Sequence, residues 1–179
     1  SWGYQVCGYY APTSRYGSPE DFKYFIDKMH EAGIGVILDW NPATFPSDEH
    51  GLIAFDGGAA YEAVDPHGNM EGRDYRIFDF EKGEVRSFLL SSAMFWLRRY
   101  HADGLRVSAV SQVLYSAPDG NVSAAATMFL WQLTSRVRAE FPDAWVIADG
   151  AHGCSGVTAP ITRGGFGFHL KWNNSFNDV

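Results

Sequence analysis

Polar side chains stand at the carboxyl ends of several short apolar runs, where they could act together in catalysis. They are Tyr10, Asp39, Arg106 with Ser108, and Asp149. An arginine keeps a neighbouring carboxylate charged, and two carboxyl groups in different charge states can supply a nucleophile and a proton donor. An aspartate after a strand also often does no more than cap the next helix, so both interpretations stand at this point.

The runs that carry these residues alternate with amphipathic stretches. Apolar runs predict strands at 5–9, 35–39, 104–107, 145–148 and 166–170. The run at 35–39 is continuous, which is typical of a parallel strand buried on both faces. Helices are predicted from residue 19 to Gly33, over 85–96 and over 124–140.

The first of these helices has a clear start. Ser18 fits the N-cap, Pro19 the first helical position and Asp21 the third. The apolar residues that follow at helical spacing predict one buried face: Phe22, Phe25, Ile26 and Met29.

The order β-α-β-α-β predicts a parallel sheet with right-handed crossovers. A doubly wound sheet and a (β/α)8 barrel both satisfy it. The lack of a Gly-x-Gly-x-x-Gly turn and of a Walker loop disfavours nucleotide-binding folds. The segment 41–82 exceeds the ~12–15 residues usual for an unstructured connection, so a functional loop is expected there.

The composition of the chain limits the classes of function that are expected. The chain has 179 residues, 46% of them apolar, which is enough for one buried core. A net charge of −7 argues against binding to nucleic acid or to an anionic membrane. We expect no membrane span, because no run of eighteen apolar residues occurs.

The start lacks an initiator Met and a signal peptide, which suggests an excised chain. Aromatic residues make up 16%, which core packing explains, although sugar clefts also use such rings.

Cysteine and histidine show no metal-binding spacing. Cys7 and Cys154 lie far apart, and we expect buried thiols in a reduced, cytoplasmic compartment without a disulfide. The six histidines form no paired motif, so neither a metal nor a cofactor is expected. His101 and Asp103 are predicted to shape the turn from helix to strand.

Four motifs follow one another along the chain: Gly-Tyr-Tyr-Ala-Pro-Thr-Ser-Arg-Tyr-Gly at 8–17, Gly-Ile-Gly-Val-Ile-Leu-Asp-Trp at 33–40, Asp-Gly-Leu-Arg-Val at 103–107 and Ile-Ala-Asp at 147–149. In combination they resemble the glycogen (1,4-α-glucan) branching enzymes of the α-amylase superfamily, glycoside hydrolase family 13. Malto-oligosyltrehalose trehalohydrolases share part of this pattern, but the run at 8–17 favours branching enzymes.

The resemblance implies a retaining mechanism on an α-1,4-glucan, either glycogen or a malto-oligosaccharide. An Asp attacks the anomeric carbon and a Glu protonates the leaving oxygen. A 6-hydroxyl of a second glucan then resolves the covalent intermediate. By position, Tyr10 matches the floor of the sugar subsite. Asp39 matches the carboxylate that organises the site, and Arg106 matches the arginine beside the nucleophile.

Other positions depart from the family pattern. Ser108 stands at the nucleophile and Asp149 at the acid/base Glu, one methylene too short. Thr44 stands where the family has a sugar-binding His, and Gly150 replaces an acidic residue. The fourth motif, with a transition-state-stabilising Asp, is not reached by Val179. We therefore expect a catalytically impaired protein.

The resemblance predicts an α/β fold: a partial (β/α)8 TIM barrel with roughly strands 2 to 6. Residues 1–179 would form a single partial catalytic-barrel domain, truncated at both ends. Its open strand edges predict marginal stability or aggregation unless the remaining barrel segments complete the fold. The alternatives are a non-catalytic glucan-binding pseudoenzyme and a trehalohydrolase-like hydrolase.

Overall fold

A parallel sheet forms the centre of the computed structural model, which describes residues 3–63, 74–117 and 120–173. The strand order is β1-β4-β5-β6. The strands are β1 (Ile37–Trp40), β4 (Gly104–Val107), β5 (Trp145–Ala148) and β6 (Leu170–Lys171). The longer helices are α1 (Pro19–Glu31), α2 (Gly83–Tyr100) and α4 (Ala124–Glu140).

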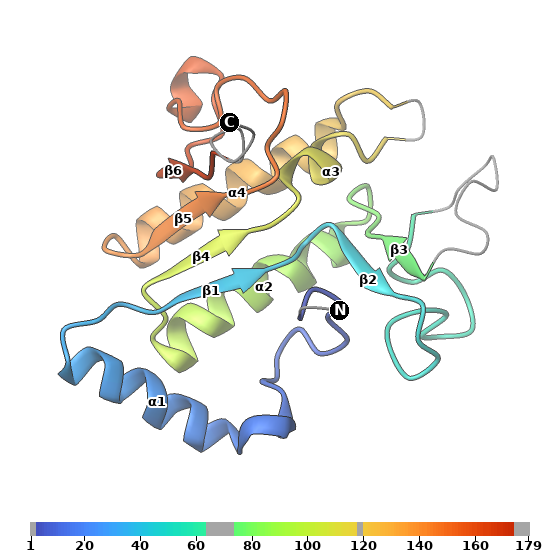
Figure 1. Ribbon diagram of the computed structural model, residues 1–179. Helices are drawn as coiled ribbons and strands as arrows, with labels where there is room; N and C mark the ends of the chain where they lie inside the picture. The colour runs from blue at the N-terminus through green and yellow to red at the C-terminus, as the bar shows by residue number, and fades with distance from the viewer. Residues whose placement is uncertain (1–2, 64–73, 118–119, 174–179) are drawn as a thin grey trace, which may run out of the picture.

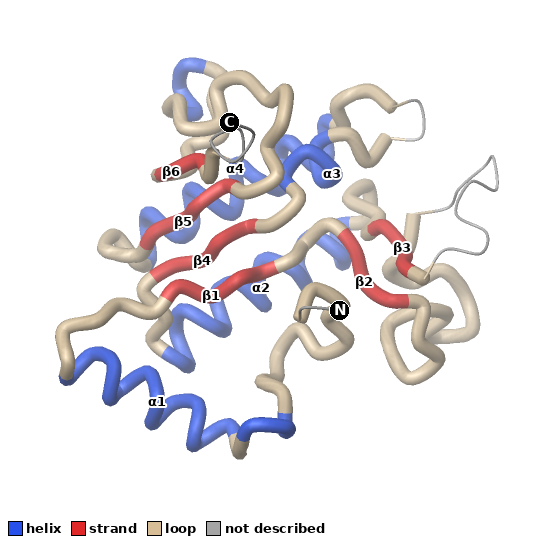
Figure 2. Tube along the Cα trace, in the orientation of Figure 1, coloured by secondary structure: helices blue, strands red, loops and turns tan. Residues whose placement is uncertain are grey.

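The helices distinguish between the two architectures that the sequence left open. Within the described residues, α2 and α4 lie on the same face of the sheet, and α1 packs beside α2 (Figures 1 and 2). A doubly wound sheet carries helices on both faces, whereas a barrel carries them on its outer face only. The arrangement is therefore that of a section of a barrel.

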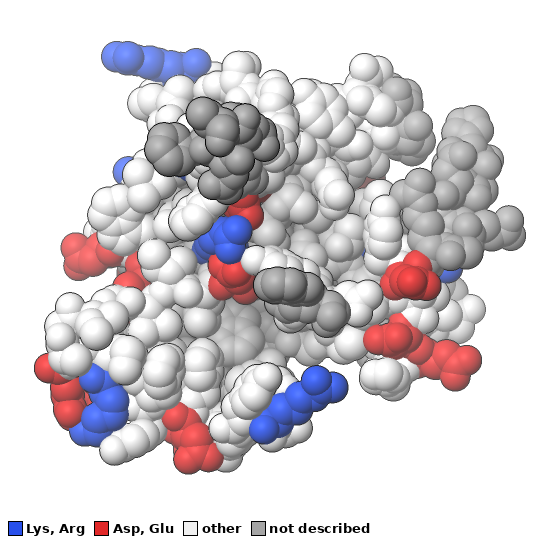
Figure 3. All heavy atoms as spheres, viewed as in Figure 1, with Lys and Arg blue, Asp and Glu red and all other residues white. Residues whose placement is uncertain are grey.

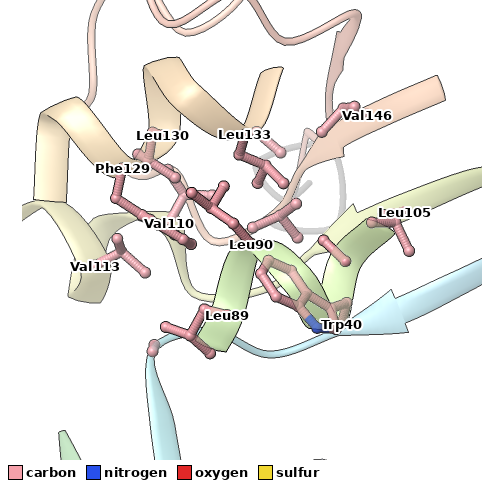
Figure 4. Close-up of a cluster of buried hydrophobic side chains, with 14 of the residues drawn as sticks. Trp40, Leu89, Leu90, Leu105, Val110, Val113, Phe129, Leu130, Leu133 and Val146 are labelled. Carbon is pink, nitrogen blue, oxygen red and sulfur yellow. The ribbon is translucent and has the colours of Figure 1, made fainter. Parts of the chain in front are cut away.

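The core lies between this sheet and its two helices. Leu105 and Val107 of β4 are completely buried on the helix side, and Trp40 at the end of β1 lies beside Phe129 of α4, with ring centroids 6.4 Å apart. Figure 4 shows these helices and strands contributing side chains to one apolar cluster. Because side chains alternate across a strand, the residue between Leu105 and Val107 must point to the opposite face.

The start of α1 confirms the predicted cap. The Ser18 hydroxyl accepts a hydrogen bond from the Asp21 amide at 3.1 Å, and the Asp21 carboxylate accepts one from the Ser18 amide at 2.8 Å. Pro19 is the first helical residue. The predicted apolar face is wrong in part, because Ile26 is its only buried member and Phe25 is 48% exposed. Among the described elements, α1 packs mainly against α2.

Two of the predicted strands differ from the structure. Residues 5–9 form bends and a turn instead of a strand. Side-chain contacts hold this segment in place: Tyr9 is buried, and its hydroxyl donates to the carbonyl oxygens of Asn41 and Thr44. The strand at 35–39 is not buried on both faces. Ile37 is 47% exposed, because it lies two residues before Asp39 and faces the side of the sheet that α2 and α4 leave uncovered.

Other short elements were not predicted, or were predicted at different bounds. An antiparallel pair, β2 (Thr44–Pro46) and β3 (Tyr75–Ile77), lies within the long segment 41–82. A short helix, α3 (Val110–Leu114), follows β4, and the strand expected at 166–170 is reduced to β6. Single-turn 3-10 helices occupy Ser14–Tyr16 and Ile161–Arg163. None of the described helices has the length and apolar character needed to cross a membrane.

The turn from α2 to β4 is held by Asp103, as its position in the sequence predicted. His101 ends α2 in the left-handed conformation, with φ 55°. The Asp103 carboxylate accepts the Val36 amide at 2.6 Å and lies 2.8 Å from Nε2 of His30. Burial opposes the charged form, but the Val36 amide and His30 outweigh it and lower the pKa of Asp103.

We predict that Asp103→Asn lowers the free energy of unfolding by about 1 kcal/mol at neutral pH, since the carboxylate is partly exposed and screened. Because the pKa of Asp103 is lower in the folded state, its carboxylate contributes its full stabilisation above the unfolded-state pKa of about 3.9. This stabilisation is lost as the pH falls through the folded-state pKa. Urea unfolding at several pH values should therefore show the difference shrinking in acid. Asp27→Asn, at an exposed position of α1, is the matched control. A pH-independent difference would contradict this account.

Candidate active site

Three of the polar residues predicted from the strand ends, Asp39, Arg106 and Asp149, meet on the face of the sheet that α2 and α4 leave open. Asp39 of β1 pairs in register with Arg106 of β4, so their side chains share a face. Figure 3 views this face and shows a basic group flanked by acidic groups near its middle. The carboxyl end of β5 brings Asp149 to the same place.

Arg106 joins the strand ends through its guanidinium. Its Nη1 donates to Oδ2 of Asp39 at 2.8 Å, and its Nη2 donates to Oδ2 of Asp149 at 2.6 Å. The guanidinium carbon also lies 4.9 Å from the centre of the Trp172 ring, within range of a cation–π interaction. We refer to Arg106, Asp39, Asp149 and Tyr4 as the Arg106 centre.

Tyr4 is the member of this centre that the sequence did not predict. Its hydroxyl donates to Oδ2 of Asp39 at 2.7 Å and accepts from Nη1 of Arg106 at 3.1 Å. The bond to Asp39 raises the pKa of Tyr4, since an ionised phenol would repel the carboxylate. Tyr4 lies in an irregular segment, where neither periodicity nor a strand end marks it.

The electrostatics of the centre favour a permanent charge on Arg106. Partial burial disfavours the guanidinium charge, but the hydrogen bond and charge of Asp39, followed by the charge of Asp149, raise the pKa of Arg106 above its usual value. The arginine therefore stays cationic throughout any reaction cycle, and it cannot serve as a proton donor.

A tight turn after β5 fixes Asp149. Its Oδ1 accepts the Gly150 amide at 2.7 Å, and its backbone carbonyl accepts the Val110 amide at 3.0 Å. Gly150 has φ +62°, and a Cβ there would lie 3.0 Å from the Cα of Ala109. A larger residue at 150 would strain this turn, which accounts for glycine at the position.

Ser108 is buried next to the centre but has no catalytic partner among the described residues. Its hydroxyl donates to the Trp40 carbonyl at 3.3 Å, and its amide donates to the same oxygen at 3.0 Å. It is 7% exposed. A serine becomes a nucleophile only when a base takes its proton, and a backbone carbonyl cannot do so.

Two predicted substrate-binding residues lie outside the Arg106 centre. The Tyr10 hydroxyl donates to the Phe88 carbonyl of α2 at 2.7 Å, and its ring packs against Phe88 and Phe95. Thr44 begins β2, where its hydroxyl accepts from Asn41 at 3.2 Å. The described contacts bring neither side chain to Asp39, Arg106 or Asp149.

A cleft of about 1170 Å³ adjoins the centre without containing it. It lies between the N-terminal segment and α1, and aromatic side chains such as Phe22, Phe25 and Trp96 line it. Asp39 is the one member of the Arg106 centre on its wall. We place the candidate site at the Arg106 centre and not in this cleft, because catalysis by proton transfer depends on ionisable side chains and not on the size of a cavity.

The cysteines correct one sequence expectation. Both are free, but neither is buried: Cys7 is exposed and Cys154 is half-buried. Partial desolvation, followed by the hydrogen bond to Asp48, raises the pKa of the Cys7 thiol.

We predict that Tyr4→Phe lowers the free energy of unfolding by about 1 kcal/mol, because it removes a hydroxyl bonded to a carboxylate and a guanidinium. Urea unfolding measures the change. Tyr16→Phe is the matched control, because Tyr16 is 89% exposed and should show a change near zero. Equal effects of the two substitutions would show that Tyr4 does not hold the centre together.

Curated relatives match nearly the whole chain. "1,4-alpha-glucan branching enzyme GlgB" of Cellvibrio japonicus (strain Ueda107) is 48% identical over 187 residues, covering 97% of this chain and 25% of the relative. The protein of the same name from Aquifex aeolicus (strain VF5) is 49% identical over 185 residues, covering 97% and 29%. The chain thus spans between a quarter and a third of the length of these relatives. No protein-family model matches it.

Solved structures support the same relationship. A putative alpha amylase from Salmonella typhimurium is 27% identical with a TM-score of 0.74, covering 98% of this chain and 28% of that structure. The maltogenic alpha-amylase AmyB from Thermotoga neapolitana, at 19% identity and a TM-score of 0.62, covers 81% and 31% and shows the fold alone. The predicted partial (β/α)8 barrel is confirmed. The chain is thus related to the 1,4-alpha-glucan branching enzymes of the α-amylase superfamily.

Proposed function

We propose that this chain is part of a protein that acts on α-1,4-glucans as branching enzymes do, and that its catalytic chemistry is impaired. The observation that carries the proposal is the Arg106 centre. Arg106 lies between the carboxylates of Asp39 and Asp149, in a segment 48% identical to a 1,4-alpha-glucan branching enzyme.

A retaining transfer needs two carboxyl groups with different tasks. In the first step, a carboxylate bonds to the anomeric carbon as the glycosidic bond breaks, and the acid gives its proton to the leaving oxygen. In the second step, an acceptor 6-hydroxyl gives its proton to the same residue and displaces the carboxylate. Asp149 stands at the position of that acid, but a carboxylate to attack the sugar is missing where Ser108 stands.

The surroundings of Arg106 support the loss of a carboxylate at position 108. Nε of Arg106 is buried and has no hydrogen-bond partner among the described residues. Residues 106 and 108 are two apart at the end of β4, so their side chains project to the same side of the sheet. An aspartate at 108 would therefore offer an acceptor to this orphaned donor, which the shorter serine hydroxyl does not.

The rival hypothesis is a pseudoenzyme that binds glucan without cleaving it. It uses the same residues and differs only in turnover. The third interpretation, a hydrolase resembling the malto-oligosyltrehalose trehalohydrolases, is less well supported, since the relatives reported above are named branching enzymes.

The partner expected for this sheet is the rest of the barrel, whose strands would pair with its open edges. The outer edges of β1 and β6 are unpaired within the described sheet, and Ile37 and Leu170 at these edges are 47% and 45% exposed. Unpaired apolar strand edges associate readily with other chains. We propose that these edges pair with neighbouring strands of a longer protein, so the activity experiments below use the chain joined to such segments.

A branching assay and a calorimetric titration with maltoheptaose separate the two leading hypotheses. Slow but measurable branching together with binding of maltoheptaose is the result that the impaired enzyme predicts, whereas binding without any branching would support the pseudoenzyme. Branching at a rate comparable to that of a relative with intact motifs would exclude impairment. Absence of both binding and branching in a folded protein would exclude a glucan site.

Repair of the site gives a sharper prediction. The triple change Ser108→Asp, Asp149→Glu and Thr44→His should restore glycosyl transfer. Ser108→Asp alone should remain roughly 10²-fold slower than the triple variant, because the shorter side chain of Asp149 places its carboxyl group about 1 Å from the required place. Asp149→Glu with Thr44→His and Ser135→Asp, an exposed position of α4, is the control with the same charge and should be inactive. Failure of the triple variant to turn over, with its fold intact, would refute an impairment limited to these positions.

A further inference from the structure

Three side chains with metal-ligating atoms converge away from the Arg106 centre. Cys7 lies in the N-terminal segment, and Asp48 and His50 lie in the loop that follows β2. One ligand atom from each lies within 4.8 Å of the other two, and the thiol sulfur is 3.5 Å from Oδ2 of Asp48. None of the three takes part in the glucan chemistry proposed above.

The distances fit a small tetrahedral cation. Zinc–sulfur and zinc–oxygen bonds of about 2.3 and 2.0 Å place sulfur and oxygen about 3.5 Å apart around a tetrahedral ion. Sulfur of Cys7 and oxygen of Asp48 already have this separation. The imidazole of His50 needs to approach by roughly 1.5 Å at most, since nitrogen and oxygen ligands of zinc lie about 3.3 Å apart, and a rotamer change of an exposed side chain supplies this movement.

The ligand types select among metals. A thiolate and an imidazole suit zinc and its neighbours, whereas calcium and magnesium require oxygen ligands. All three side chains are accessible, so water can fill the fourth position. Sequence spacing did not reveal this group, because 41 residues separate Cys7 from Asp48 and the fold alone brings them together.

We propose that Cys7, Asp48 and His50 bind a zinc-type divalent cation that joins the N-terminal segment to the loop after β2. In the structure the Cys7 thiol donates a hydrogen bond to Asp48. On metal binding the thiol would release its proton to solvent, and the cation would bridge the two side chains. The cation would restrain the segment that carries Tyr4, three residues before Cys7, and so the hydroxyl that contacts Asp39 and Arg106.

Cobalt(II) substitution tests the site directly, because thiolate coordination produces an intense charge-transfer absorption. Adding Co²⁺ to the chain, joined to its neighbouring barrel segments, should generate this band, and Zn²⁺ should abolish it by displacement. Cys7→Ser should lose the band, while Cys154→Ser, the matched control, should keep it. Zn²⁺ should also raise the thermal midpoint of the unaltered chain and of Cys154→Ser, but not that of Cys7→Ser.

Asp48→Asn and His50→Gln test whether the site is more than a reactive thiol. Each should weaken Zn²⁺ binding at least about tenfold, since even the loss of an outer-shell partner costs ~10–100-fold. Far-UV circular dichroism of each variant confirms that its fold is intact. A cobalt band that survives in Cys7→Ser, or a Zn²⁺ affinity unchanged in both Asp48→Asn and His50→Gln, would overturn the proposal.

Discussion

The charge of Arg106 is the constraint on which this face of the molecule depends. A guanidinium that is only 23% exposed must be neutralised, because transfer of an unpaired charge out of water is costly. Asp39 and Asp149 supply the compensating charges from two other strand ends, and Tyr4 adds a hydroxyl from the N-terminal segment. One cation thereby brings together parts of the chain that are 102 residues apart.

The strands around Arg106 place the charged side chains as the proposed glycosyl transfer requires, but one of the reacting groups is absent. The parallel register of β1, β4 and β5, together with the turn at Gly150, places Asp39, Arg106 and Asp149 within hydrogen-bonding distance. The attacking group is the missing part. Ser108 is held by the Trp40 carbonyl, while Nε of Arg106 is left without an acceptor in the described part of the chain. The absence of an attacking carboxylate is the basis of the proposed impairment.

Local signals predicted the regular elements well. The cap at Ser18 and the helix over 124–140 depend on neighbouring residues, and both are found as expected. The predictions that were wrong concern segments whose structure depends on residues far away in the sequence. Residues 5–9 are apolar enough for a strand, but they are held by Tyr9 and its bonds to Asn41 and Thr44. Ile37 is exposed because its side chain faces the side of the sheet that α2 and α4 leave uncovered, and an apolar run does not encode which face is covered.

The candidate site shows the same division. Strand ends predicted Asp39, Arg106 and Asp149, because parallel strands bring their carboxyl ends to one edge. Tyr4 was missed, since it lies outside any regular element, and Tyr10 is bonded to Phe88 instead of the centre. The group formed by Cys7, Asp48 and His50 was missed for the reason that its members are neighbours only after folding.

A double-mutant cycle between Arg106 and Asp39 tests the central claim most directly. The free energy of unfolding is measured for Arg106→Met, Asp39→Asn and the double variant, and the cycle between Lys28 and Glu31, an exposed pair 2.6 Å apart, is measured alongside. The account predicts a coupling of about 1–3 kcal/mol for Arg106 and Asp39, against about 0.2–1 kcal/mol for the exposed pair. A coupling no larger than that of Lys28 and Glu31 would contradict the role assigned to Arg106.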